Sequence, residues 1–170
     1  MLTSSQIKKL FHDLNEFLKQ EDVKGEVGIC GGAVMCLVFK ARASTKDVDA
    51  IFEPSQVIRK AAEKVARKNH LEKGWLNDAA KSYFHADPPR ENVLDFSHLK
   101  VWAPRADYML AMKCIAARYD THDQKDVVYL IEYLNLKRVE DVFKVIEKYY
   151  PRHQIPSKTQ FLIEEIFENK

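Results

Sequence analysis

The chain has 170 residues, of which 46% are hydrophobic and 31% are charged. These values are typical of a folded globular protein of one ordinary domain and exclude a disordered chain. The formal net charge is only +2, so the protein has no strong overall basic field. Any binding to nucleic acid must therefore come from a local patch.

The cysteines and the N-terminal residues bear on the compartment. Cys30, Cys36 and Cys114 lie in apolar or helical stretches without Cys-x-x-Cys spacing, which predicts buried, reduced thiols and no disulfide or zinc framework. The N-terminus has no apolar core of a signal peptide, and no stretch reaches transmembrane length. We therefore expect a cytoplasmic protein without a membrane partner.

The first part of the chain predicts a helix, a strand and a glycine turn. Residues 3–20 have apolar residues at helical spacing, with Thr3, Ser4 or Ser5 as candidate N-caps. Residues 26–30 form a short, mostly apolar run that stops at Gly31-Gly32, as expected for a strand that ends in a tight turn. A helix to about Phe39 follows, and its free N–H groups would face the same turn, where they would favour a phosphate.

The motif Asp47-Val48-Asp49 places two carboxylates on one face of a predicted strand, because side chains in a strand alternate between faces. Two adjacent carboxylates repel each other, and a divalent cation such as Mg²⁺ removes the conflict while it bridges to phosphates. An isolated pair is also typical of solvated charges on an edge strand. The diglycine turn before the pair favours a site for phosphoryl or nucleotidyl transfer.

The middle of the chain predicts a helix over 55–69, an irregular stretch over 71–89, and strands over 93–96 and 99–103. The helix has a basic outer face, which we interpret as a solvated surface in preference to a platform for RNA. In the irregular stretch, Trp75 is expected to fill the core and Asn77 or Asp78 to cap a short helix over 79–84. The basic residues are Arg59, Lys60, Lys64, Arg67 and Lys68.

The last third is predicted to be helical, over about 105–118, 120–134, 139–149 and 156–168, with Pro104 in the first turn of the first of these helices. Lys113 lies in an otherwise apolar run, so it needs an anionic partner unless its side chain extends to the surface. Asp120, His122, Asp123 and Asp126 follow within seven residues. Their spacing is compatible with a transition-metal site, or with acidic residues at a helix N-terminus.

Several motifs carry a resemblance to a known family. The order of strand, diglycine, helix, Ser44-Thr45 and Asp-hydrophobic-Asp resembles the nucleotidyltransferase superfamily. The run 42–49, Arg-x-Ser-Thr-Lys-Asp-Val-Asp, resembles its small bacterial branch of AbiEii-type toxins and minimal nucleotidyltransferases. The helix with Lys113, the sequence Trp75-Leu76-Asn77-Asp78, and Arg118 followed by Asp123-x-x-Asp126 are similar to patterns of that branch.

The resemblance implies an α+β fold, a nucleotidyltransferase-like small mixed sheet flanked by helices. Residues 1–103 would form the α/β core, and residues 104–170 a C-terminal helical part that completes the same site and core. The implied activity is metal-dependent transfer of a nucleoside monophosphate from a nucleoside triphosphate to a hydroxyl of RNA, especially tRNA, or of a protein. The cofactor would be Mg²⁺ or Mn²⁺. Related proteins are often toxins, so an antitoxin is an expected partner.

The resemblance also implies a set of site residues. Asp47 and Asp49 would hold the metal, with Asp95 as the candidate for a third metal ligand and Asp78 as its alternative. Lys113 would face the phosphates, and Asp126 would point into the active site. Two alternatives stay open: a nucleotidyltransferase fold without activity that serves as a nucleotide-binding or regulatory module, and a hydrolase with a metal at His122, Asp123 and Asp126. The implied nucleotide-binding residues are Gly31, Gly32, Arg42, Ser44 and Thr45.

Overall fold

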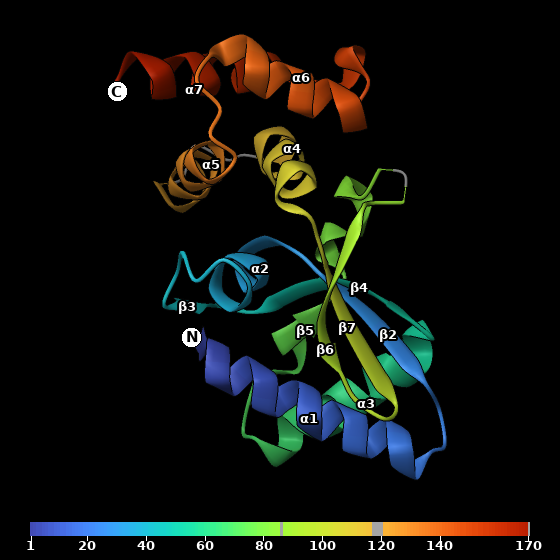
Figure 1. Ribbon diagram of the computed structural model, residues 1–170. Helices are drawn as coiled ribbons and strands as arrows, with labels where there is room; N and C mark the ends of the chain where they lie inside the picture. Colours follow the sequence, from blue (N-terminus) through green and yellow to red (C-terminus); the bar gives the residue numbers. More distant parts are fainter. Residues whose placement is uncertain (86, 117–120, 170) are drawn as a thin grey trace. The chain divides into compact units, whose positions relative to one another are not determined.

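A computed structural model of the protein describes residues 1–85, 87–116 and 121–169. The fold is α+β, as predicted, with a mixed sheet flanked by helices and a helical C-terminal part (Figure 1). The chain divides into two compact units, the first formed by 1–81 and 90–104 and the second by 82–89 and 105–170. We describe each unit by itself.

The first unit is built on a five-stranded mixed sheet in the order β5-β4-β2-β7-β6. β2 pairs antiparallel with β4 and parallel with β7, while β6 is antiparallel to β7 and β5 is parallel to β4. A separate pair joins β1 (Leu2–Thr3) to β3 (Ser44–Thr45). The five strands are β2 (Gly25–Ile29), β4 (Val48–Glu53), β5 (Leu76–Asn77), β6 (Arg90–Asp95) and β7 (Leu99–Pro104).

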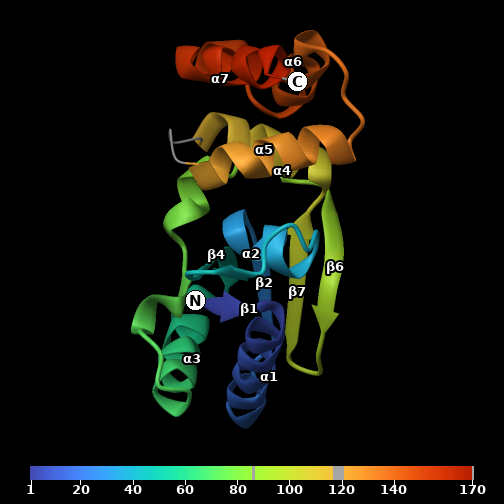
Figure 2. The ribbon, with the colours of Figure 1, turned by 90° about the vertical axis from the view of Figure 1, so that its left-hand side faces the viewer.

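Two helices, α1 (Ser4–Gln20) and α3 (Ser55–Lys68), run side by side and cover one face of this sheet (Figures 1 and 2). A Cβ on Gly25 of β2 would come within 2.9 Å of Leu18 in α1 and 3.1 Å of Ile58 in α3, so both helices contact the sheet there closely. The predicted cap of α1 is confirmed, because the Gln6 N–H donates to Thr3 Oγ1 and the Thr3 N–H donates to Gln6 Oε1.

The predicted core position of Trp75 is also confirmed. Trp75 is 3% exposed, its ring lies edge-on to Phe11, and its Nε1–H donates to the Ala62 carbonyl of α3. Asn77 accepts a hydrogen bond from the Ala79 N–H at the start of η2 (Ala79–Tyr83), as expected of a capping residue. Buried alternate residues of β2, β4 and β7 complete this core: Val27, Ile29, Val48, Ala50, Leu99 and Val101.

The side chains of the other face, here called the polar face, follow from the strand register. Gly28 of β2 is a neighbour of Trp102 of β7, and a Cβ on Gly28 would lie 2.2 Å from the Trp102 ring. The Arg90 guanidinium lies 4.2 Å from the centroid of that ring and bonds to Glu26 at 2.6 Å. The polar face thus carries Glu26, Gly28, Asp49, Ile51, Glu53, Arg90, Lys100 and Trp102.

The second unit contains α4 (Ala106–Ala116), α5 (Thr121–Tyr133), α6 (Val139–Tyr149) and α7 (Ser157–Glu168). Helix α4 packs against both α5 and α6, and its residues Tyr108, Met109 and Leu110 are fully buried. Pro104 is the last residue of β7, so it precedes α4 and does not lie in its first turn as predicted. None of the described helices has the length and apolar character needed to cross a membrane.

Aromatic residues tie residues 82–89 to the second unit. The Tyr108 hydroxyl accepts from the His85 N–H at 2.9 Å and donates to the His85 carbonyl at 2.8 Å. The Tyr150 hydroxyl donates to the Tyr83 carbonyl, and its ring stacks on His85. This network explains why a short segment before β6 belongs to the helical unit.

Candidate functional site

The glycine turn after β2 brings backbone and carboxylate close together. Gly31 has φ of +59°, a conformation that is strained for residues with a Cβ. A Cβ there would also lie 3.1 Å from Asp49 Oδ2. The Cys30 N–H donates to the Asp49 carbonyl at 2.9 Å, which fixes the start of β4 beside the turn. Conformation and close approach therefore both favour glycine at position 31.

Gly32 makes room for a second group of side chains. A Cβ at Gly32 would lie 2.5 Å from Thr45 Oγ1 and 3.5 Å from Nη1 of Arg42. Thr45 is only 6% exposed. Helix α2 (Gly31–Leu37) begins at this turn and contains Cys36. Burial raises the pKa of the Cys36 thiol, and it outweighs the Ser4 backbone hydrogen bond and the charge of Arg42, which both lower this pKa. The diglycine turn thus has Asp49 against one residue and Thr45 with Arg42 against the other.

The segment between α2 and β4 supplies the side chains of Arg42 and Thr45, and the pairing of β1 with β3 holds this segment in place. Leu2 is a neighbour of Thr45 and Thr3 is a neighbour of Ser44, and Leu2 is 4% exposed. Helix α2 ends at Leu37, two residues before the predicted end. The strand pair anchors the C-terminal part of the loop, immediately before Asp47.

Asp47 and Asp49 fit a hard divalent cation by their chemistry. Asp49 lies in β4, and the alternation of the strand directs it toward the polar face, while Asp47 lies in the bend directly before β4. Both residues are partly exposed, and the space beside Gly31 is filled by the Asp49 carboxylate. Among the residues that the structure describes, no group of three or more His, Cys, Asp or Glu is arranged to hold a metal. Two carboxylates suit Mg²⁺, which retains waters and completes its shell with substrate phosphates.

The strand register places Asp95 away from this pair. Asp95 is a neighbour of Lys100, and Lys100 is a neighbour of Glu26 at the start of β2, whereas Asp49 lies beside the end of β2. About four residues of strand, or ~13 Å, therefore separate the two levels. In the perpendicular direction, across the sheet, β4 and β6 are three strand spacings apart, which is ~14 Å. Asp95 is thus too far from Asp47 and Asp49 to share one ion.

Asp78, the alternative third carboxylate, is paired with Arg59 of α3. It follows Asn77 in the chain, so alternation directs it toward the face covered by the helices.

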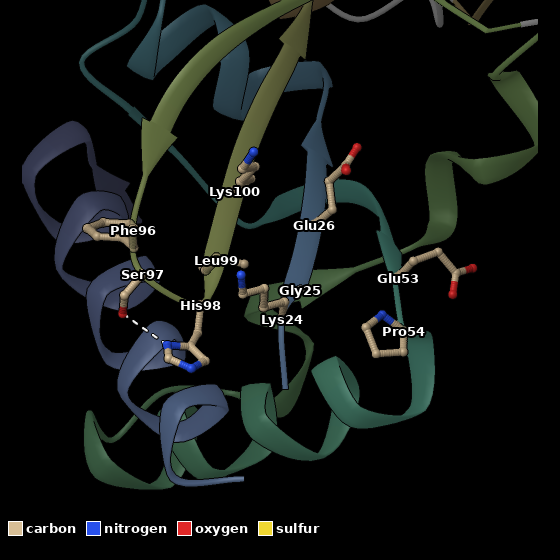
Figure 3. A pocket seen from close by; sticks show the side chains of 10 residues that line it. All are labelled: Lys24, Gly25, Glu26, Glu53, Pro54, Phe96, Ser97, His98, Leu99 and Lys100. Atoms are coloured by element: carbon tan, nitrogen blue, oxygen red, sulfur yellow. Dashed lines mark hydrogen bonds between the residues drawn. The ribbon is translucent and has the colours of Figure 1, made fainter. Parts of the chain in front are cut away.

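A pocket of about 510 Å³ at the Asp95 end of the sheet contains none of the predicted site residues (Figure 3). Its lining includes Lys24, Glu26, Glu53, Phe96, His98 and Lys100.

Lys113 has the anionic partners that its apolar surroundings require. Its Nζ lies 2.8 Å from Asp123 Oδ1 and 2.8 Å from Asp126 Oδ2. Lys113 is 8% exposed and Asp126 is 2% exposed, so the side chain does not extend to the surface. These ion pairs also engage Asp123 and Asp126, which are two of the three residues of the alternative metal site with His122. Arg118 and Asp120 lie outside the described residues.

A family model described as "Nucleotidyltransferase of unknown function (DUF6036)" matches residues 5–163. The chain belongs to this nucleotidyltransferase family. Searches of curated proteins and of solved structures found no match. The match covers both units, so it includes the glycine turn and aspartate pair of the first unit and the Lys113 ion pairs of the second.

In this member of the family, the basic face of α3 is largely neutralised by acidic neighbours. Lys64 bonds to Glu21 at 3.1 Å and Lys68 bonds to Asp13 at 2.6 Å, while Arg59 pairs with Asp78. Hydrogen bonds from Lys68 and Asn69 and the charges of Lys68 and Lys9 outweigh burial and lower the pKa of Asp13. These pairs support the interpretation of α3 as a solvated surface.

Two polar arrangements in the structure were not predicted from the sequence, namely the position of Asn77 beside Asp49 and the hydrogen bonds of Asp107. Asn77 lies directly beside Asp49 in the β4–β5 register, and a strand of two residues gives no periodic signal. Asp107 of α4 accepts hydrogen bonds from the Tyr149 hydroxyl at 2.5 Å and from Lys148 at 3.1 Å. Burial raises the pKa of Asp107, but these bonds and the charges of Lys148 and Arg105 lower it by more. Its partners are 41 and 42 residues away in sequence, so only the fold brings them together.

Proposed function

We propose that the protein is a metal-dependent nucleotidyltransferase that transfers a nucleoside monophosphate from a nucleoside triphosphate to an acceptor hydroxyl. The observation that carries this proposal is the packing at the diglycine turn. Asp49 lies against Gly31, while Thr45 and Arg42 lie against Gly32. One side of this arrangement is acidic and suits a metal, and the other offers a guanidinium and a hydroxyl, which suit phosphate oxygens.

Each residue of the arrangement has a proposed role. Asp47 and Asp49 hold the cation, Mg²⁺ or Mn²⁺, and when bound it neutralises charge on the triphosphate and on the leaving pyrophosphate. The backbone of Gly31 and Gly32 allows close approach of the phosphates, because neither residue has a side chain.

Arg42 offsets negative charge that develops on the leaving phosphates, because a guanidinium forms strong bonds to phosphate oxygens. The hydroxyls of Ser44 and Thr45 donate hydrogen bonds to the same oxygens. Asp95 and Asp78 have no part in this proposal, because the register and the Arg59 pair separate them from the turn.

The acceptor and the biological role rest on the resemblance to small bacterial nucleotidyltransferases. We propose a hydroxyl of RNA, tRNA in particular, or of a protein as acceptor, and an antitoxin as a partner of a toxin. The roles of Lys113 at the phosphates and of Asp126 beside it remain predictions. Within the second unit, the observed contact is the ion pair that joins the two residues.

The test is label transfer from each of the four α-labelled nucleoside triphosphates to total bacterial RNA and protein in the presence of Mg²⁺. The matched variants are Asp47→Asn with Asp49→Asn, which keep the side-chain volume, and Asp95→Asn, which makes the same change at the other end of the sheet. Transfer by wild type and Asp95→Asn, with none by the double variant, supports the proposal. Equal labelling by all three proteins refutes it.

The second candidate is a nucleotide-binding module without turnover. Its support is that, among the described residues, no third His, Cys, Asp or Glu forms a metal-holding group with Asp47 and Asp49. This candidate predicts Mg²⁺-dependent binding of a nucleoside triphosphate and no label transfer to any acceptor fraction. Product formation that depends on Asp49 excludes it.

A further inference from the structure

The strand register puts an amide side chain next to the proposed metal-holding carboxylate. β5 runs parallel to β4, and Asn77 is the direct neighbour of Asp49. Neighbouring strands lie about 4.8 Å apart, and paired residues present their side chains to the same face. Asn77 therefore accompanies Asp49 on the polar face, on the side of β4 opposite to β2 and its glycine turn.

The hydrogen bond that Asn77 already makes fixes which end of its amide stays available. The Ala79 N–H donates to Asn77 Oδ1 at 3.0 Å, and only the oxygen of an amide can accept from a backbone N–H. The Nδ2 group keeps two donors, and no hydrogen bond from Nδ2 forms within the described part of the chain. Asn77 is partly exposed, so the residue is not closed off from solvent or from a ligand.

We infer that Asn77 is a substrate-binding residue whose Nδ2 donates a hydrogen bond to a ribose hydroxyl of the nucleoside triphosphate. The inference rests on the proposed function. In nucleotidyl transfer the α-phosphate is the reacting group, so it lies at the cation held by Asp47 and Asp49. The β- and γ-phosphates then extend to the glycine turn on the β2 side, and the ribose lies on the other side of the α-phosphate, toward β5.

The chemistry of the amide agrees with this placement. A neutral NH₂ donor suits the oxygen of a hydroxyl and adds no charge beside two carboxylates. One neutral hydrogen bond changes affinity by roughly 3- to 10-fold. Wild type is therefore expected to bind the ribonucleotide roughly 3- to 10-fold more tightly than the analogue that lacks the contacted hydroxyl.

The experiment measures binding by calorimetry in Mg²⁺. The ligands are the ribonucleoside triphosphate that wild type binds most tightly, its 2′-deoxy and 3′-deoxy analogues, and inorganic tripolyphosphate. Asn77→Ala removes the amide donors, and tripolyphosphate binding by this variant shows that the protein is still folded. Asn92→Ala is the control, because Asn92 of β6 lies on the same face as a neighbour of Trp102 and loses the same amide group.

The expected result is that Asn77→Ala binds the ribonucleotide and the relevant deoxy analogue equally, while Asn92→Ala discriminates as wild type does. Asn77→Ala should bind tripolyphosphate as wild type does. Unchanged discrimination in Asn77→Ala, or no discrimination in wild type, overturns the inference and leaves the proposed function in place. Weaker tripolyphosphate binding by Asn77→Ala also overturns it, because Asn77 would then contact phosphate. A wild-type protein that binds no nucleoside triphosphate refutes the proposed function, and the inference with it.

Discussion

The ion pairs of Lys113 allow a quantitative prediction for the second unit. Lys113→Met keeps the length of the side chain but removes the ammonium group from two carboxylates at 2.8 Å. The side chain of Asp126 is 3% exposed and that of Asp123 is 24% exposed. Removal of one partner of a buried pair costs about 3–5 kcal/mol, because a buried charge is left without compensation. For a protein of this size the melting temperature should fall by about 6–20 °C.

The assay is urea denaturation together with thermal unfolding, with Lys125→Met as the control. Lys125 is an exposed residue of α5, and its change should alter stability by less than about 0.5 kcal/mol. The double variant Lys113→Met with Asp126→Asn should recover part of the loss, because it also removes the buried negative charge. Equal stabilities for Lys113→Met and Lys125→Met, or no recovery in the double variant, would refute the reasoning.

Three further predictions concern packing, pH and thiol reactivity. Gly28→Ala should lower the free energy of unfolding in urea by about 1–3 kcal/mol, because its Cβ would lie 2.2 Å from the Trp102 ring. Gly74→Ala has no atom within 4 Å and should be neutral, so equal losses would contradict the packing argument. Asp107 has a lowered pKa, so its charged form stabilises the fold at pH 7. The loss in Asp107→Asn, measured by urea titration, should shrink as the pH falls below about 4, and a constant loss would exclude this origin. Burial raises the pKa of Cys114 to about 12, so a thiol reagent at pH 8 should label it only after unfolding, and rapid native labelling would contradict this.

The sequence predicted the long elements of the fold because their hydrophobic periods are strong. Helices α1 and α3 follow from apolar stripes, and β4 and β7 follow from short apolar runs between turns. The two-residue strands β1, β3 and β5 have too few residues for any periodic signal. They form only because distant segments meet, as when Leu2 pairs with Thr45.

The features of the candidate site that depend on local residue chemistry could be predicted from the sequence. The features that depend on the register of the strands could not. The glycine pair and the Asp-x-Asp motif could be proposed as a site without tertiary information, because close backbone approach favours glycine and the proposed metal would favour carboxylates. The position of Asp95 depends on the direction of β7, which is parallel to β2 and therefore begins far from the glycine turn. The hairpin after Asp95 then places it opposite Lys100. The proximity of Asn77 to Asp49 was not predicted for the same reason, because only the pairing of β5 with β4 brings the two residues together.

The most direct test of the central claim is the Mg²⁺ dependence of nucleoside triphosphate binding in Asp49→Asn and Asp95→Asn, each compared with wild type by calorimetry. Asp49 lies against the glycine turn, while Asp95 lies at the other end of the sheet. We predict that wild type and Asp95→Asn bind the triphosphate with Mg²⁺ and not with EDTA, and that Asp49→Asn has lost the Mg²⁺-dependent binding. Wild-type affinity in folded Asp49→Asn would contradict the assignment of the site to the glycine turn and its aspartate pair.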